Sequence, residues 1–289
     1  TVNIVYSDAT IGWVPLDDDA VVDAPVVPPT QKAIFGFGSP TTAVTNLVNS
    51  SGVMAADVSG VGTARSSLAA ANYGGDKALF GFGGGPTAVT NLVSNSGVVS
   101  SDTSGVGTAR EGLAAATYDA DKAIFGYGYS GGYLSMTNLV NNVGVVATDV
   151  SGVGTARMNL GATGYGSTGQ AIFAFGSLGP YTAISNLVSS AGVVATDTSG
   201  VGSSRFSARG ATYGTDKAIF GFGYISSPTS VTSLVSNTGV ISADVSGVGT
   251  GREYPAGTGY GGDKAIFGFG NPSTAITNLV SNSGVVSSD

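Results

Sequence analysis

The sequence has no cysteine and no histidine, and Glu111 and Glu253 are its only glutamates. Disulfides and thiolate chemistry are therefore excluded, and so are Ser-His-Asp and Cys-His nucleophiles and the common zinc sites. A glycosidase needs two carboxyl groups about 5–10 Å apart, but each glutamate follows a repeated arginine in a different repeat. These absences predict a protein that is not an enzyme and that holds neither a cofactor nor a metal ion.

Charge is also scarce. Only 10% of the residues are charged, the net charge is −7 and the isoelectric point is about 4.4. Such a chain repels phosphate backbones, so nucleic-acid binding is not expected. No apolar run is long enough for a membrane span, and no basic segment precedes an apolar one as in a signal peptide. We therefore expect no insertion into a membrane.

Glycine is abundant instead, with 47 residues, and 42% of the residues are hydrophobic. That apolar fraction suffices for a large core, and the glycines have no three-residue period, which excludes collagen. Small, β-branched and aromatic residues together with many Gly and Asn favour short strands joined by tight turns. No segment shows a sustained helical period. The sequence therefore predicts an all-β fold.

One motif, DKAIFGFG, recurs with small changes every 45 to 48 residues. The copies start near residues 32, 77, 122, 170, 217 and 264. Each repeat also carries a segment like TAVTNLVSN, a segment like GVVSSD, and a segment like SGVGTAR that leads into small residues ending in Tyr-Gly. Each of the four parts contains a strand of about four to eight residues bounded by turn signals.

Four short strands in a unit of this length are typical of a β-propeller blade. The stretch AIFGFG is apolar on both faces, which suits a strand covered on both sides by neighbouring blades, and its glycines permit close approach. We predict a β-propeller of six blades, each with four antiparallel strands, over residues 32–289. The small-residue run would be inner strand A, with strands B, C and D following outward. A β-helix is the main alternative.

The predicted blades are not all complete. Inner strands are expected at about 66–73, 111–118, 158–165, 206–213 and 254–260, so the first blade lacks one. A strand from beyond Asp289 would complete it, and the segment TVNIVYSD is the rival candidate. A seventh blade supplied from beyond Asp289 is the alternative to six.

Residues 1–31 differ from the repeats. The stretch TVNIVYSDATIGWVPL predicts a strand, a turn and a second short strand, so we assign residues 1–15 to the end of an upstream β module. Residues 16–31 are rich in Pro and Asp and predict a semi-extended linker. Asp17, Asp18 and Asp19 could bind a cation, but a solvated linker explains them better.

Two charged residues recur once per repeat, an arginine in GTAR and an aspartate at the end of the GVVSSD-like segment. Arginine can donate to carbonyls of adjacent turns and the nearby aspartate can accept from it, so both are expected to be architectural. The aspartate would cap its own backbone in an Asx-type turn. The alternatives are a ring of arginines that binds an acidic ligand, and a calcium site, for which the usual spacing is missing. These residues are Arg65, Arg110, Arg157, Arg205, Arg252, Asp57, Asp102, Asp149, Asp197 and Asp244.

Variation is concentrated in the connections. The B–C connection has six residues in blades 1, 2 and 6 and eight in blades 3, 4 and 5, and the residues just after each arginine also differ. Both connections should emerge on one face, where loops on a rigid scaffold commonly carry function. Exposed tyrosines suit sugar rings and protein surfaces; the alternative is that these loops simply vary. The candidate ligand-binding residues are Tyr129, Tyr133, Tyr181, Tyr224, Phe206, Arg209, Glu111, Glu253 and Tyr254.

Two resemblances rest on these residues. An arginine before a small-residue strand, followed by an aliphatic-aromatic strand ending in glycines, resembles Kelch-type propellers, although the glycines form Gly-Phe-Gly and the outer-strand tryptophan is missing. The sequence pattern KAIFGFG…TNLVSNTGVV…SGVGTAR is similar, over roughly residues 32–289, to repeats in structural and tail-fibre-like proteins of tailed phages, especially marine cyanophages. IVYSDATIGWVP resembles the end of small modules that precede tip domains in phage structural proteins.

The phage resemblance implies a non-catalytic binding or adhesion propeller of a virion, located on the particle and outside the cell. Its partners would be a host-surface glycan or protein and other virion proteins, and an upstream stalk would make it oligomeric. A purely structural decoration or spacer domain is the alternative. A secreted carbohydrate-active enzyme is the third interpretation.

Overall fold

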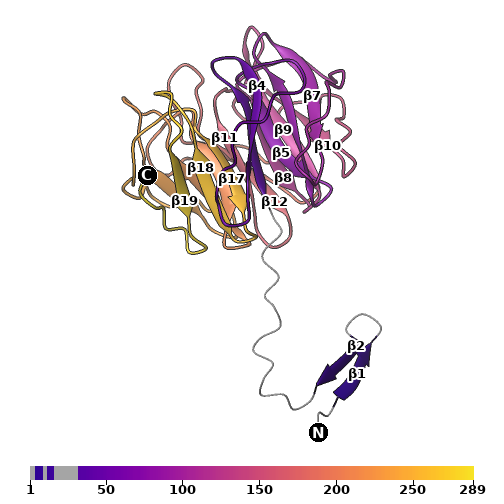
Figure 1. Ribbon diagram of the computed structural model, residues 1–289. Coiled ribbons are helices and arrows are strands. Elements are labelled where there is room, and N and C mark those ends of the chain that lie inside the picture. Colours follow the sequence, from indigo (N-terminus) through magenta and orange to yellow (C-terminus); the bar gives the residue numbers. More distant parts are fainter. Residues whose placement is uncertain (1–3, 9–11, 16–31) are drawn as a thin grey trace. The chain divides into compact units, whose positions relative to one another are not determined.

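The computed structural model describes residues 4–8, 12–15 and 32–289. The chain divides into two compact units, Thr1–Thr30 and Gln31–Asp289. In the first unit, β1 (Ile4–Asp8) and β2 (Gly12–Pro15) form an antiparallel hairpin (Figure 1), as the sequence predicts. The expected linker, with Asp17, Asp18 and Asp19, lies outside the described residues. The described part of the chain contains no helix able to span a bilayer.

The second unit is built from small antiparallel sheets, one for each repeat, which we number sheets 1 to 6 in chain order (Figure 1). Sheet 1 has two strands, β3 (Ala33–Gly38) and β4 (Thr42–Val48). Sheets 2 and 3 contain β5 (Ala69–Tyr73), β6 (Lys77–Gly83), β7 (Thr87–Val93), β8 (Ala114–Tyr118), β9 (Lys122–Tyr129) and β10 (Tyr133–Val140). Sheet 4 contains β11 (Gly161–Tyr165), β12 (Gln170–Ala174) and β13 (Ser185–Val188). Sheets 5 and 6 contain β14 (Arg209–Tyr213), β15 (Lys217–Gly221), β16 (Thr232–Val235), β17 (Ala256–Tyr260), β18 (Lys264–Gly268) and β19 (Thr277–Val280).

The all-β fold and the first three strands of each repeat are confirmed. In sheets 2 to 6 the motif strand lies in the centre, between the small-residue strand and the TNLV strand. The small-residue strands β5, β8, β11, β14 and β17 fall within the predicted inner-strand ranges. β5, β8, β11 and β14 each contact the small-residue strand of the next sheet, so these strands lie together at one side of sheets 2 to 6.

The fourth strand predicted for each repeat is wrong as a continuous strand. The GVVSSD-like segment pairs with the outer strand only through isolated bridges, such as Val93 with Val99 and Thr90 with Thr103. Val99 is 8% exposed and its neighbour Val98 is 65% exposed, so only one of the two valines reaches the core. Between the bridges, Asp102 turns toward another connection. The ladder is therefore interrupted where a strand would need to continue.

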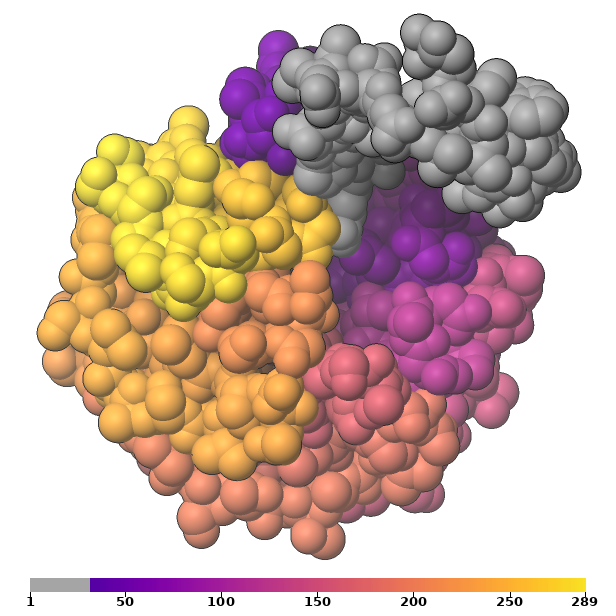
Figure 2. Space-filling model, turned by 90° about the horizontal axis from the view of Figure 1, so that it is seen from below, coloured from indigo at the N-terminus to yellow at the C-terminus, as the bar shows by residue number. Residues whose placement is uncertain are grey.

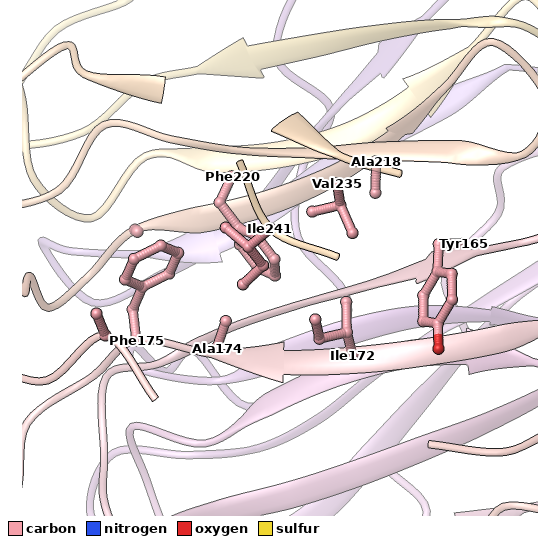
Figure 3. Packing of buried hydrophobic residues seen from close by; sticks show 10 residues of the cluster. Tyr165, Ile172, Ala174, Phe175, Ala218, Phe220, Val235 and Ile241 are labelled. Carbon is pink, nitrogen blue, oxygen red and sulfur yellow. The ribbon is translucent and has the colours of Figure 1, made fainter. Parts of the chain in front are cut away.

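Neighbouring sheets pack face to face through the rings of the repeated motif. Figure 3 shows Ile172 and Phe175 of sheet 4 pointing toward Phe220 of sheet 5. The motif glycines bring the sheets close together, because a Cβ on Gly126 would lie 2.7 Å from the Phe173 ring of the next sheet. This confirms the role in close packing predicted for the glycines.

The second aromatic residue of each motif leaves the strand geometry. Phe82 has φ 63° and is followed by Gly83 with φ 126°, a left-handed conformation that bulky residues rarely adopt. Its ring packs 5.0 Å from Phe125 of the next sheet. The equivalent residues of all six repeats share this conformation, with φ between 60° and 64°. Each motif therefore supplies one aromatic residue to its own strand and a second to the boundary with the next sheet.

The contacts also join the last sheet to the first. Figure 2 shows the repeats following one another around the molecule in chain order. Phe35 of sheet 1 lies 5.4 Å from Phe269 of sheet 6 between ring centroids. Tyr260 and Ile266 of sheet 6 share a core cluster with Ala33 of sheet 1. The arrangement of the six small sheets is consistent with a propeller-like fold.

Candidate functional site

The five repeated arginines are buried between sheets, at no more than 2% exposure. The Nε of Arg110 donates to the Tyr127 carbonyl at 2.8 Å and its Nη2 donates to Asn138 Oδ1 at 2.6 Å, both in sheet 3. Its guanidinium lies 4.3 Å from the ring centroid of Phe82 in sheet 2. All five arginines stack on an aromatic ring in this way, at 4.0 to 4.4 Å. We call the arginine, its ring and its acceptors the arginine latch.

The latch ties two sheets together through the backbone as well. The Gly83 amide of sheet 2 donates to the Arg110 carbonyl at 3.0 Å, and the Arg110 amide donates to the Thr87 carbonyl at 3.4 Å. Burial lowers the pKa of Arg110 to about 10, while Asp149 acts in the opposite direction, so the side chain remains charged at neutral pH. Because these guanidinium groups have no free surface, the structure gives them the architectural role and not that of a ligand-binding ring.

The repeated aspartates clamp a segment from elsewhere in the chain. The Asp102 carboxylate accepts from the Thr63 amide at 3.1 Å, from the Thr63 hydroxyl at 2.6 Å and from Asn91 at 2.8 Å. Asp149, Asp197, Asp244 and Asp289 accept equivalent bonds from connections 39 to 42 residues earlier. The predicted Asx-type cap of the aspartate's own backbone is therefore corrected. The arginine that an aspartate approaches also precedes it by one repeat, as with Arg205 and Asp244 at 3.2 Å.

Acid should weaken this clamp. Hydrogen bonds from the Thr63 and Thr250 hydroxyls are the main causes that lower the pKa values of Asp102 and Asp289 below 3.8. A carboxyl with a lowered folded-state pKa stabilises the protein above its unfolded-state pKa, and this contribution is lost as pH falls through the folded value. We expect the urea midpoint to be steady from about pH 7 to 5 and to fall below about pH 4. The Asp102→Asn/Asp289→Asn double variant should have a lower urea midpoint at pH 7 than the wild type, and its midpoint should fall less in acid. An identical fall in both proteins would contradict the assignment of the acid loss to these carboxylates.

The variable connections of neighbouring segments pair with each other on one face. The residue after four of the five latch arginines exchanges backbone hydrogen bonds with the start of the B–C connection, as Glu111 does with Tyr129 at 3.0 and 2.8 Å. Phe206 and Tyr224 pair in the same way at 3.2 and 3.0 Å. The expected sharing of one face by the two kinds of connection is confirmed. We call the residues after each arginine together with the B–C connections the loop face.

Four aromatic residues from three sheets meet on the loop face. Phe206 lies at the centre, with ring centroids 4.7 Å from Tyr181, 5.4 Å from Tyr224 and 5.8 Å from Tyr254. Tyr181 and Tyr224 are 6.0 Å apart. Tyr181 is 38% exposed and Tyr254 42%, while the other two are half-buried. We call these four residues the aromatic cluster; all four were predicted from the sequence as loop-face candidates.

Polar groups adjoin the cluster at its inner side. Arg209, at the start of the inner strand β14, donates to the Leu160 and Ala208 carbonyls at 3.3 and 3.2 Å. Its side chain lies deep in the protein but keeps part of its surface exposed, and burial lowers its pKa to about 10 while Tyr254 acts to raise it. Asn159 donates from Nδ2 to the Tyr254 hydroxyl at 3.4 Å. The cluster therefore combines flat apolar rings with a cation, an amide and hydroxyl groups.

The remaining candidates, Tyr129, Tyr133, Glu111 and Glu253, lie outside the aromatic cluster. Tyr129 and Tyr133 form a separate pair with ring centroids 5.8 Å apart, on the ends of β9 and β10. Glu253 accepts from Asn271 at 2.6 Å in the connections of sheet 6, whereas Glu111 belongs to sheet 3. These contacts pair neither glutamate with another carboxyl group. Among residues 32–289 and the described hairpin, no three acidic side chains are close enough to hold a metal ion.

Asn159 is the member of this site that sequence reasoning missed. It occupies the second position after Arg157 and has φ 52°, which Asn tolerates better than most residues. The backbone N–H of Asn159 donates to the Gly112 carbonyl at 2.7 Å, and the backbone carbonyl of Asn159 accepts from the Ser207 backbone N–H at 2.7 Å. These two bonds link three successive connections. The signal was the polar side chain at a variable position, but no local pattern connects it to Tyr254, 95 residues later.

Two open hollows in the surface lie elsewhere. The larger, of about 550 Å³, runs along the boundary of sheets 3 and 4 and includes Tyr118, Lys122 and Leu139. The other includes Tyr133 and Asp149. Neither contains a residue of the aromatic cluster. No protein-family model matches the chain, and no curated protein matches it by sequence.

Proposed function

We propose that this protein is a non-catalytic adhesion module of a phage virion that binds a host-surface glycan through the aromatic cluster. The observation that carries the proposal is the meeting of Tyr181, Phe206, Tyr224 and Tyr254 on the loop face. These residues come from positions where the repeats differ, while the latch keeps its arginine and a stacked Phe or Tyr ring in all five copies. Variation of a few loops on a constant scaffold is how many binding proteins acquire specificity.

A closed, six-bladed propeller of Kelch-like type is the scaffold that we propose for this function. The face-to-face packing of successive sheets and the contact of Phe35 with Phe269 support closure. The arginine latch supports the Kelch resemblance, since an arginine before each small-residue strand is one of its marks. A closed ring would hold the connections of sheets 4, 5 and 6 in fixed positions, so the four rings need no ordering when a ligand binds.

A glycan is the ligand that best fits the chemistry of the cluster. Sugar rings stack on exposed tyrosine faces, and their hydroxyl groups take hydrogen bonds from phenol, amide and guanidinium groups. Tyr181 and Tyr254 supply exposed rings, and Asn159 and Arg209 lie next to them. The two glutamates are in separate connections. A host-surface protein is the other kind of partner that the aromatic cluster could bind.

The Tyr181→Ala variant tests the proposal. We expect a loss of binding of about tenfold or more, because truncating a central aromatic residue of an interface commonly has an effect of this size. Binding of the purified protein to a panel of surface glycans, and to intact cyanobacterial cells, would be measured for the wild type and the variant. Because Tyr181 is 38% exposed, its removal should leave the fold unchanged, which circular dichroism would check.

Tyr133→Ala is the matched control, because this tyrosine is also on the loop face and is also 38% exposed, but lies outside the aromatic cluster. We expect its binding to equal that of the wild type. Equal losses in the two variants would place the contact over the whole loop face. Wild-type binding by Tyr181→Ala would remove the aromatic cluster as the binding site.

A structural role in the particle is the second candidate, and one observation favours it. The first residue after the glycine in every GVV-like segment is an exposed valine, 60% to 66% exposed. These are Val53, Val98, Val145, Val193, Val240 and Val285. Repeated apolar groups on the outer edge of every sheet suit contact with other virion proteins. If deletion of residues 32–289 lowers particle stability but leaves adsorption intact, the structural role replaces adhesion.

A further inference from the structure

The five latches repeat one arrangement of an extended segment between two sheets, although Arg65 Nη2, Arg205 Nε and Arg252 Nε have no acceptor among the described residues. At the boundary of sheets 5 and 6, the Gly223 amide donates to the Arg252 carbonyl at 2.9 Å and the Arg252 amide donates to the Thr229 carbonyl at 3.3 Å. Arg252 stacks 4.0 Å from Phe222 and donates to Asn278 Oδ1 at 2.6 Å. The segment then continues as β17, which pairs with β18. A Gly-Thr-x-Arg segment and its small-residue strand therefore bind as one unit.

The boundary of sheets 6 and 1 carries the same receiving groups. Phe269 has φ 60° and occupies the position of Phe222, and Gly270 and Thr274 occupy those of Gly223 and Thr229. On sheet 1, Asn46 donates to Asp57 at 2.8 Å, the distance that Asn91 and Asp102 have in a complete latch. The amide and carboxylate that hold a Gly-Thr-x-Arg segment elsewhere are therefore already in place on sheet 1.

Within the described residues, these groups are more accessible than most of their counterparts. Asn46 is half-buried, whereas Asn91, Asn138, Asn186 and Asn278 are fully buried. Phe269 is half-buried, whereas Phe82, Tyr127, Phe175 and Phe222 are fully buried; Phe37, which belongs to sheet 1 and stacks on Arg65, is half-buried as well. A Cβ on Gly38 would meet nothing within 4 Å, but one on the equivalent Gly83 would meet Ser66 and Leu68, in the segment that leads into β5. The inner side of sheet 1 thus has space of the kind that an inner strand fills.

The chain has no arginine left to fill this boundary. Five of its six arginines already belong to latches, and the sixth, Arg209, lies in β14 and donates to the Leu160 carbonyl. Residues 1–31 contain no arginine. An occupant with the chemistry of the other five boundaries must therefore be a segment other than these 289 residues.

We propose that the inner side of β3, with Asn46, Asp57 and Phe269, is an acceptor site for an extended partner segment of the form Gly-Thr-x-Arg followed by a strand of small residues. Asp57 would accept from the threonine, and Asn46 Oδ1 and the Phe37 carbonyl from the arginine, whose guanidinium would stack on Phe269. The following strand would pair with β3 as β5 pairs with β6. Small side chains are required because the inner strands of adjacent sheets contact one another.

A synthetic peptide with the sequence of residues 59–74, SGVGTARSSLAAANYG, tests the site on the protein of residues 1–289. Isothermal titration calorimetry should give one peptide per protein, and the peptide should raise the melting temperature as a ligand of the folded state does. Replacing the peptide's arginine with alanine should weaken binding about tenfold or more, since it removes charged hydrogen bonds and the stacked cation. A scrambled peptide should not bind.

The variants Asp57→Asn and Asp102→Asn locate the contact. They change the same position of the repeat, but Asp102 already holds Thr63, whereas Asn46 is the only described partner of Asp57. We expect Asp57→Asn to weaken the peptide about tenfold and Asp102→Asn to bind it as the wild type does. Absence of binding to the wild type at millimolar peptide overturns the proposal. Binding that Asp57→Asn leaves unchanged also overturns it. Both readouts are independent of glycan binding.

Discussion

Replacing Arg157 with alanine is expected to lower the free energy of unfolding by about 4 kcal/mol. Arg157 is fully buried, and its guanidinium donates to the Phe175 carbonyl at 2.8 Å, the Thr155 carbonyl at 3.0 Å and Asn186 Oδ1 at 2.8 Å. It also stacks 4.3 Å from the Tyr127 ring. Alanine would leave buried acceptors without donors, at about 1–3 kcal/mol each, and would open a cavity at the boundary between sheets 3 and 4.

Two further variants separate the parts of this effect. Arg157→Lys keeps the charge, but its compact ammonium lacks the planar fork that reaches all three acceptors and stacks on the Tyr127 ring, so we expect an intermediate loss of about 2–3 kcal/mol. Arg209→Ala is the control, because Arg209 is the one arginine outside a latch and, among the residues that the structure describes, donates only to the Leu160 and Ala208 carbonyls at 3.3 and 3.2 Å. Urea denaturation monitored by circular dichroism measures all three. A loss below about 1 kcal/mol for Arg157→Ala would show that the latch is not a main source of stability.

The strands that the sequence predicts well are those whose signals are local. The motif starting at Lys77 and the run ending at Tyr73 each contain alternation, flanking glycines and turn residues within a few positions, and they form β6 and β5. The GVVSSD-like segment has similar residues, but its pairing is decided elsewhere. Asp102 is drawn to Thr63, 39 residues earlier, and a local pattern contains no sign of this partner.

The difference between local and distant partners also explains why the hydrogen-bond partners of the repeated aspartates were predicted wrongly. Sequence reasoning paired each aspartate with its own backbone or with the arginine that follows it by eight residues, as with Asp57 and Arg65. The structure instead joins residues one repeat apart, because the connection that enters a sheet passes over the end of that sheet's last segment. Once the repeat is known, residues about 40 positions apart in the sequence can be expected to lie as close in space as residues that are neighbours in the sequence. The sequence could identify the pair of residue types but not the register.

The candidate site was predicted residue by residue and not as a group. Tyr181, Tyr224, Phe206 and Tyr254 were all loop-face candidates together with Tyr129 and Tyr133, and nothing in the sequence divides these six. The backbone geometry separates the pair Tyr129 and Tyr133 from the four residues of the aromatic cluster. β9 and β10 extend as far as Tyr129 and Tyr133, whose side chains then form their own pair. β12 and β15 end at Ala174 and Gly221, so the connections that follow are free to turn.

The largest effect of a substitution on the exposed surface is expected at Gly200. This glycine of the SGVG segment is exposed, but a Cβ there would overlap the backbone carbonyl of Ala183. Gly60 and Gly105 meet Ala43 and Ala88 in the same way, so the contact is part of every such repeat. It holds the connection flat against the sheet five residues before the latch arginine Arg205.

We therefore expect Gly200→Ala to lower the free energy of unfolding by about 3 kcal/mol, because the backbone of Ala183 cannot move aside as a flexible side chain can. Displacement of the connection would also draw Ser203 away from Asp244, to which it donates at 2.8 Å. Gly132→Ala is the matched control: Gly132 is equally exposed, a Cβ there would meet nothing within 4 Å, and its φ is not in the left-handed region. That variant should lie within about 0.5 kcal/mol of the wild type. If the two variants have the same urea midpoint, the close approach of the connection to the sheet does not determine the position of the latch.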